Sequence, residues 1–181
     1  NTLRDYLTGE IIEETTYEEF RQALAKLLVE ERGYPRERLK AKVPLSYSVN
    51  NEEYGRELDL VAYDQDRRPL LVVIFCSGEV GSFERETAIA AQLMADGPAP
   101  FALTTDTRDA SLLDTATGTV LAQGMQAVPY WDELLEKSVR MPRMPLSLER
   151  KERLTRIFHA YNGFLIDSCC SSECCGPVKK A

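Results

Sequence analysis

The chain has 181 residues, a formal net charge of −7 and a hydrophobic content of 44%. This size and composition are typical of one globular domain with its own buried core and a short extension. The charge excludes a strongly basic nucleic-acid-binding protein, although a local basic face is compatible with it. No apolar stretch approaches the roughly 20 residues that span a bilayer, and the first residues lack the basic-then-apolar pattern of a signal peptide. We therefore expect a cytoplasmic protein without a membrane partner.

The first predicted element is a helix over residues 17–32. Thr16 is its expected N-cap, and Glu18 lies in the first turn, where a carboxylate stabilises the positive end of the helix dipole. Gly33 follows as the expected end of the helix. Apolar residues at helical spacing indicate one buried face, formed by Phe20, Leu24, Leu27 and Leu28.

The elements that follow alternate between strands and a helix. The predicted elements are strands over 39–47, 57–63 and 70–76, a helix over 82–95, and strands over 101–105 and 118–123. The strand over 70–76 is a nearly continuous apolar run, as expected for a central strand covered on both faces. The order helix, three strands, helix, strand predicts an α/β domain with a central mixed sheet.

The character of the chain changes after residue 128. Helices are predicted over 131–138 and 148–161, joined by a linker that contains Pro142 and Pro145. We therefore predict a domain over residues 1–128 and a C-terminal helical extension over 129–181. The extension ends in a cysteine-rich tail with Cys169, Cys170, Cys174 and Cys175.

The cysteine-rich tail is a candidate metal site. In a cytosolic protein, clustered cysteines indicate metal ligation or redox chemistry rather than structural disulfides. The candidate ligands are Zn²⁺ and an iron–sulfur cluster. The spacing is atypical for zinc, so four reduced thiols without a ligand are the alternative. With a bound metal, the chain would be a metal-stabilised interaction module.

An ordered set of segments carries a family resemblance over roughly residues 15–125. The segments are 17–24, 27–39, 58–63, 69–73, 91–93 and 101–105, and the most specific is the Gly-Tyr-Pro-x-Glu-Arg-Leu block at 33–39. In this set the chain resembles the N-terminal nuclease domain of type I restriction enzyme R subunits, of the PD-(D/E)xK nuclease superfamily. The resemblance implies a restriction-endonuclease-like αβββαβ core.

The resemblance also implies a site that cleaves DNA with Mg²⁺ or Mn²⁺. In that family, an Asp on one strand and a Glu-x-Lys motif on the next hold the metal and activate water. By resemblance, Asp59 matches the metal-binding Asp, Glu18 an acid on the first helix, and Gln92 a Gln on the second helix. The Glu and Lys positions hold Ile74 and Cys76 instead. The expected catalytic and metal site is therefore degenerate.

These two replacements remove specific chemistry. A hard divalent cation needs oxygen ligands, and Ile74 offers none. A neutral thiol at Cys76 does not supply the cation that positions water and stabilises developing charge. We therefore expect a catalytically impaired protein that binds DNA or a protein partner in a restriction or repair complex. The alternative is an active endonuclease with displaced residues, drawn from Lys42, Glu57, Glu79, Glu84 and Glu86.

Each candidate residue also has a structural interpretation. Asp59 could cap the hairpin or pair with Arg21, because a buried acid needs a partner whatever its role. Glu18 could serve only the helix dipole, and Cys76 could be an inert buried thiol. Five basic residues offer either a phosphate-binding edge or a solvated mixed-charge face. They are Arg32, Arg36, Arg38, Lys40 and Lys42.

Overall fold

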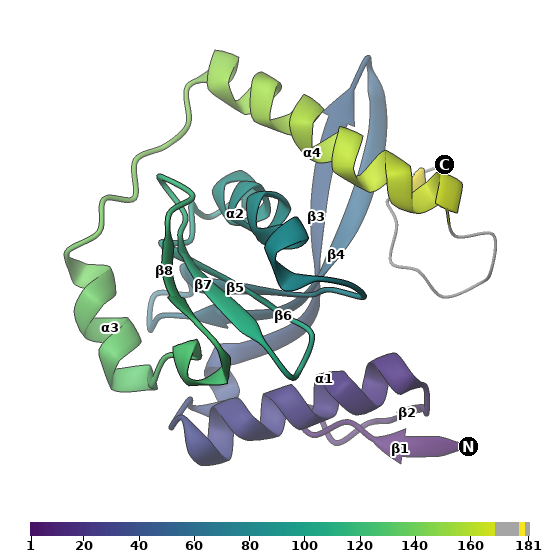
Figure 1. The fold of residues 1–181 in the computed structure, drawn as a ribbon, viewed down its shortest axis with the longest axis vertical. Coiled ribbons are helices and arrows are strands. Elements are labelled where there is room, and N and C mark those ends of the chain that lie inside the picture. The colour runs from purple at the N-terminus through teal and green to yellow at the C-terminus, as the bar shows by residue number, and fades with distance from the viewer. Residues whose placement is uncertain (169–177, 180–181) are drawn as a thin grey trace.

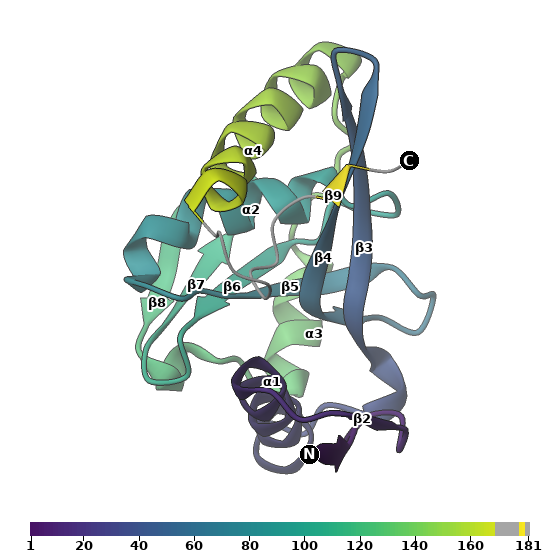
Figure 2. The ribbon, with the colours of Figure 1, turned by 90° about the vertical axis from the view of Figure 1, so that its right-hand side faces the viewer.

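The computed structural model describes residues 1–168 and 178–179, with side chains as far as Asn162. It shows a mixed α/β fold in which one sheet lies between two layers of helices (Figures 1 and 2). The sheet has the strand order β3-β4-β5-β6-β7-β8, and β9 pairs with β4 beside this path. Strands β5 and β6 run parallel, and the other neighbouring strands are antiparallel. The predicted α/β class with a central mixed sheet is confirmed.

The strands of this sheet are β3 (Leu39–Val49), β4 (Glu52–Tyr63), β5 (Pro69–Phe75), β6 (Phe101–Thr105), β7 (Ala110–Asp114), β8 (Val120–Gln123) and β9 (Val178–Lys179). A separate antiparallel hairpin is formed by β1 (Thr2–Arg4) and β2 (Ile11–Glu13). The helices are α1 (Thr16–Lys26), α2 (Glu84–Leu93), α3 (Trp131–Val139) and α4 (Leu148–Ser168). Within the described residues, none of these helices has the length and apolar character needed to span a bilayer.

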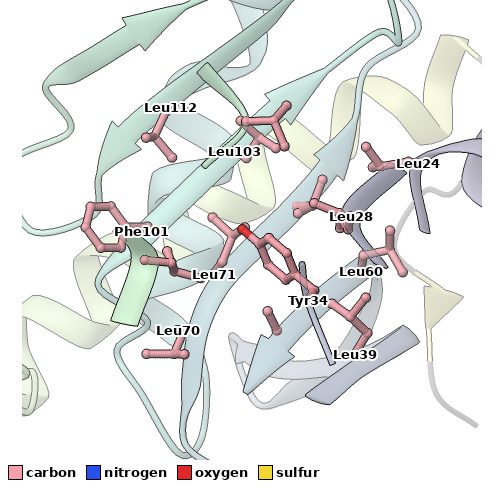
Figure 3. Close-up of a cluster of buried hydrophobic side chains, with 14 of the residues drawn as sticks. Leu24, Leu28, Tyr34, Leu39, Leu60, Leu70, Leu71, Phe101, Leu103 and Leu112 are labelled. Carbon is pink, nitrogen blue, oxygen red and sulfur yellow. The ribbon is translucent and has the colours of Figure 1, made fainter. Parts of the chain in front are cut away.

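One apolar cluster fills the space between the sheet and helices α1 and α3. Leu24 of α1 and Leu28 of the π-helical turn after it belong to this cluster, together with Leu60 of β4, Leu103 of β6 and Tyr34 (Figure 3). The Tyr34 hydroxyl donates a hydrogen bond of 2.9 Å to the carbonyl of Pro129, so this buried phenol is satisfied. Burying each aliphatic side chain stabilises the fold by roughly 1.5–3 kcal/mol.

A second cluster fills the opposite face, beneath α2 and α4. Phe158 of α4 packs in this cluster with Ile89 of α2 and Ile74 of β5. Every residue of α2 from Glu86 to Leu93 is buried, because α4 covers the side of α2 that the sheet does not (Figure 2). The extension after residue 128 thus contributes to both clusters, since α3 packs in the first and α4 in the second. The predicted boundary between 128 and 129 stays a prediction.

Several predicted helix features need correction at their ends. The N-cap of α1 is Thr15, whose hydroxyl accepts a 3.1 Å hydrogen bond from the Glu18 amide, and Thr16 is already helical. A π-helical turn over Leu27–Glu31 extends α1 to the predicted end, where Gly33 adopts a left-handed φ of 76°. Phe20 was predicted to be buried but is 43% exposed, because the buried face of α1 is centred on Arg21 and Ala25 and Phe20 lies at its edge.

The β3–β4 hairpin is longer than predicted. Its turn needs only Asn50 and Asn51, both with positive φ, so Val49 already pairs with Glu52. Asparagine tolerates this conformation, which suits the tight turns that match strand twist. Strand β7 was not predicted, and neither was the β1–β2 hairpin, whose strands have three residues each. Such short strands carry little periodicity and form only through their partners.

Candidate functional site

The predicted acid Asp59 lies at a fork, where strand β4 separates from strand β5. The two strands pair from Tyr63 to Leu60, and Leu60 is the last residue of β4 with a partner on β5, which is Val73. One residue further, Asp59 Oδ2 accepts a 2.7 Å hydrogen bond from the backbone amide of Phe75. The Asp59 carboxylate thus binds a β5 amide at the point where the ladder between the strands has ended.

The second oxygen of Asp59 is held by helix α1. The hydroxyl of Tyr17 donates a 2.5 Å hydrogen bond to Asp59 Oδ1, and the Tyr17 ring contacts Phe75 edge to face at 6.2 Å between ring centroids. Asp59 is only 4% exposed. Burial therefore raises the pKa of its carboxyl, whereas the hydrogen bonds from Tyr17 and Phe75 oppose that rise.

Glu18, the predicted helix acid, is paired with two cations. Its Oε2 accepts hydrogen bonds from Arg21, at 2.6 Å from Nη2 and 2.8 Å from Nε. Its Oε1 forms an ion pair with Lys42 of β3, which has a left-handed φ of 52°. Arg21 also lies 3.3 Å from Asp5, which precedes α1. The predicted direct pair between Asp59 and Arg21 does not form, because Arg21 binds Glu18 and Asp5 instead.

Another buried ion pair, between Arg56 and Glu86, lies on the α2 side of the fork. Arg56 of β4 lies 3.2 Å from Glu86 of α2, and both side chains are at most 4% exposed. The same Arg56 nitrogen donates a 2.7 Å hydrogen bond to Asn162 of α4, which in turn donates to the carbonyl of Phe158 at 2.9 Å. Burial raises the pKa of Glu86, Arg56 opposes this, and the charge of Asp59 adds to it.

The positions of the missing Glu-x-Lys motif are apolar or neutral. Ile74 is fully buried in the cluster beneath α2. Cys76 is buried just after β5, where its backbone amide donates a 3.0 Å hydrogen bond to Thr105, and burial raises the pKa of its thiol. The thiol therefore stays neutral at physiological pH, as an inert buried cysteine does.

The structure does not bring the other predicted residues to the fork. Gln92 lies six residues along α2 from Glu86, roughly 9 Å further along the helix axis. Its amide donates a 2.6 Å hydrogen bond to the carbonyl of Thr115, on the loop after β7. Glu57 and Glu79 are exposed, and Glu84 accepts a hydrogen bond from Ser111. The tail residues Cys169, Cys170, Cys174 and Cys175 lie outside the described residues.

The predicted basic edge is dispersed. Arg32 lies over the ring of Tyr130 and donates to the carbonyl of Val128, whereas Lys42 binds Glu18. The remaining contacts are cation–π pairs, Arg36 with Tyr6 and Lys40 with Tyr63. These cations contact different neighbours, which fits the solvated mixed-charge alternative better than a phosphate-binding edge.

Residues that sequence reasoning did not place in the site include Tyr17, Arg56 and Asn162. Glu86 was considered only as a displaced ligand, yet it precedes Ile89, Ala90 and Leu93 by three, four and seven residues. That spacing places Glu86 on the apolar face of the helix and signals a buried acid in need of a partner. Arg56 and Asn162 carry no such signal, because their contacts join residues 106 positions apart.

The carboxylates around the fork do not fit a hard divalent cation. Such an ion needs several oxygen ligands that converge without competing cations. Both Asp59 oxygens accept hydrogen bonds, Glu18 binds Arg21 and Lys42, and Glu86 faces Arg56. Within the described part of the chain, no three histidine, cysteine or acidic residues are grouped as metal ligands.

Comparison with known proteins identifies the family. A model of the type I restriction enzyme R protein N terminus matches residues 16–129, which is more than half of the chain. Neither the curated proteins nor the solved structures gave a significant match. The matched region runs from the first residue of α1 to the residue before Tyr130, and it therefore contains Glu18, Asp59 and Glu86. The chain belongs to the family of type I restriction enzyme R protein N termini.

Proposed function

We propose that this domain is a catalytically impaired member of its family and acts by binding DNA or a protein partner in a restriction or repair complex. One observation carries this proposal: the acids at the fork are each bound by a cation or a donor from the protein itself. Glu18 with Arg21 and Lys42, and Glu86 with Arg56, form internally neutralised groups. In such groups the carboxylates are compensated by the protein's own cations, which leaves no free acid as a ligand for a metal.

The two replaced positions support the same proposal. Metal-dependent hydrolysis needs a cation that polarises the phosphate and a group that activates water. Ile74 contributes no oxygen, and the neutral thiol of Cys76 contributes no charge. When two members of one catalytic unit are lost, the remaining members retain little activity.

Cleavage of plasmid and linear DNA with Mg²⁺ or Mn²⁺ tests this proposal. We expect no cleavage by the wild-type protein and no change in Asp59→Ala or in the matched control Asp132→Ala, an exposed acid of α3. Titration calorimetry should likewise show no Asp59-dependent binding of either metal. Cleavage that disappears only in Asp59→Ala would overturn the proposal.

A ridge on α4 favours DNA as the binding partner. Arg150, Arg153 and Arg156 are exposed on this helix, and within the described residues their guanidinium groups have no hydrogen-bond or ion-pair partner. Glu149 and Glu152 line the same surface and reduce the local positive charge. Guanidinium groups bind phosphate oxygens bidentately, so this ridge offers contacts to a nucleic-acid backbone despite the net charge of −7.

Fluorescence anisotropy of a labelled DNA duplex at several salt concentrations tests this ridge. Three phosphate contacts predict a slope of log affinity against log salt of about −2.7. The triple variant R150Q/R153Q/R156Q should lose binding, whereas R85Q/R108Q/R140Q, with the same change in net charge, should retain it. Equal loss in both variants would exclude a specific ridge, and no binding by the wild-type protein would leave a protein partner.

An active endonuclease with displaced residues is the second candidate. It is favoured by one observation: Lys42 reaches Glu18 from β3, which brings a lysine and a second acid to the side of the fork where Tyr17 binds Asp59. Activity would require Glu18 to exchange Arg21 and Lys42 for a metal. Metal-dependent cleavage that is lost in Asp59→Ala and in Glu18→Gln would establish this candidate.

The metal-stabilised interaction module stays a separate prediction, because its cysteines lie outside the described residues. Elemental analysis of the purified protein tests it. Stoichiometric zinc or iron that disappears in the Cys170→Ser and Cys174→Ser double variant would support a metal-bound tail. A metal-free wild-type protein would contradict it.

A further inference from the structure

A pocket of about 650 Å³ lies away from the fork, beside the turn that joins β4 to β5. Its arginines come from three separate parts of the chain. Arg38 belongs to a short 3₁₀ helix before β3, Arg68 to the β4–β5 turn, and Arg143 to the linker between α3 and α4. Helix α3 forms another wall with Trp131 and Leu135. The volume lies within the range of roughly 300–1,000 Å³ found for small-molecule sites.

The cations of this pocket are incompletely compensated. Arg143 is largely buried, with 12% of its side chain exposed, and its Nη1 lies 3.3 Å from Asp64 Oδ2. This nitrogen still lacks a hydrogen bond of acceptable geometry. Burial and the nearby charge of Arg68 both lower the pKa of Arg143, whereas Asp64 opposes them. Within the described residues, the guanidinium groups of Arg38 and Arg68 have no hydrogen-bond or ion-pair partner.

The acids of the pocket do not complete this compensation. The other Asp64 oxygen, Oδ1, accepts hydrogen bonds from the backbone amides of Asp66 and Arg68, at 2.8 and 2.9 Å, and so holds the turn. Glu37 and Asp66 also line the pocket, but both are exposed to solvent and form no ion pair with its arginines. Among the described residues that line this pocket, Arg143 therefore carries the one buried hydrogen-bond donor without an acceptor.

Apolar side chains also line the pocket. They include Leu70, which is buried, and Trp131 and Leu135 of α3, which are one helical turn apart. The Trp131 ring packs against Tyr34, with 5.2 Å between ring centroids, so the core fixes its position. The pocket thus combines guanidinium groups with apolar side chains, among them a tryptophan that packs against the core.

We propose that this pocket binds a mononucleotide. Its phosphate is held by Arg68 and Arg143, and its base lies against the wall formed by Trp131 and Leu135. Planar guanidinium groups match the geometry of phosphate oxygens and form short charge-assisted hydrogen bonds with them. The bound phosphate supplies the acceptor that Arg143 lacks. This site is independent of the fork and of the function proposed for it.

The single tryptophan of the chain makes the site directly measurable. Trp131 is the only Trp among the 181 residues, so its fluorescence reports this pocket alone. Titration with adenosine monophosphate should change the fluorescence with saturation. Adenosine, which lacks the phosphate, and inorganic phosphate, which lacks the base, should each bind at least roughly tenfold more weakly, because each loses one half of the contacts.

Three variants decide the assignment. Arg68→Gln and Arg143→Gln should each weaken binding of the nucleotide by roughly tenfold or more. The control is Arg140→Gln, at the exposed arginine that ends α3, and this change should leave nucleotide binding unchanged. Arg68 is exposed, so its variant keeps the test valid even if Arg143→Gln unfolds the linker. Absence of a saturable change, or equal binding by Arg68→Gln and the wild-type protein, would overturn the proposal.

Discussion

Strand β4 has two segments that both contain buried residues but are stabilised differently. From Leu60 to Tyr63 it pairs with β5, and its aliphatic side chains pack in the two clusters. From Arg56 to Asp59 it has left β5, and its buried charges bind side chains and one backbone amide instead. The difference shows that burial alone does not decide residue type. Charged residues are buried in the segment where side-chain hydrogen bonds and ion pairs replace the backbone ladder to β5.

The largest expected effect comes from the charged segment. Arg56→Met leaves Glu86 buried without its cation, which should lower the free energy of unfolding by about 3–5 kcal/mol. The double variant Arg56→Met/Glu86→Leu should recover much of this loss, because the uncompensated charge is then absent. Urea denaturation monitored by circular dichroism measures both. A double variant as unstable as the single one would show that the pair is not the source of the effect.

The paired segment should respond through packing. Leu60→Ala opens a cavity in the cluster beneath α1 and should lower the free energy of unfolding by about 3 kcal/mol. The matched control is Leu121→Ala on β8, where the leucine is 48% exposed and the change should stay within about 0.5 kcal/mol. The same denaturation experiment compares them. Equal effects at the two leucines would contradict the structural core described for β4.

The hydrogen bond across the fork should have a smaller effect. Tyr17→Phe removes the donor to Asp59 Oδ1 and should lower the free energy of unfolding by about 1.5 kcal/mol, as expected for a bond to a charged group. Tyr130→Phe is the control, because Tyr130 is exposed and its contact with Arg32 is made by the ring, which phenylalanine keeps. Chemical denaturation at neutral pH measures the difference. A destabilisation by Tyr130→Phe as large as that by Tyr17→Phe would refute the role of this bond.

The smallest expected effect is a pH dependence. The pKa of Asp59 is raised by folding, so the folded state binds its proton more tightly than the unfolded state does. Its contribution to stability is therefore fully present below the unfolded pKa, and it is lost as pH rises through the folded pKa. The slope for one such group does not exceed about 1.4 kcal/mol per pH unit.

Asp59→Asn isolates this contribution, because the amide mimics the neutral acid. The stability of the variant relative to the wild-type protein should increase as pH rises from about the unfolded value of 3.8. Urea denaturation between acidic and neutral pH measures the difference, with Asp132→Asn as the control. A relative stability that decreases over that window would show that the Asp59 pKa is lowered rather than raised.

The sequence predicted part of the candidate site. It identified Asp59 as a buried acid, because a charge inside an apolar strand pattern is visible locally, and Glu18 as an acid of the first helical turn. It did not identify Arg56 or Asn162, whose hydrogen bond joins β4 to α4. Gln92 was assigned to the same site by resemblance, yet its amide donates a hydrogen bond to Thr115, on the loop after β7.

By itself, the sequence determined the order of the main elements and the family. Apolar periodicity and turn residues are local properties, so α1, β5, β6 and α3 lie close to their predicted ranges. Only the tertiary structure decided the short strands, the pairing of Lys42 with Glu18, and the closure of α4 over α2. These features join residues that are distant in the chain, and their stability comes from contacts that no local pattern encodes.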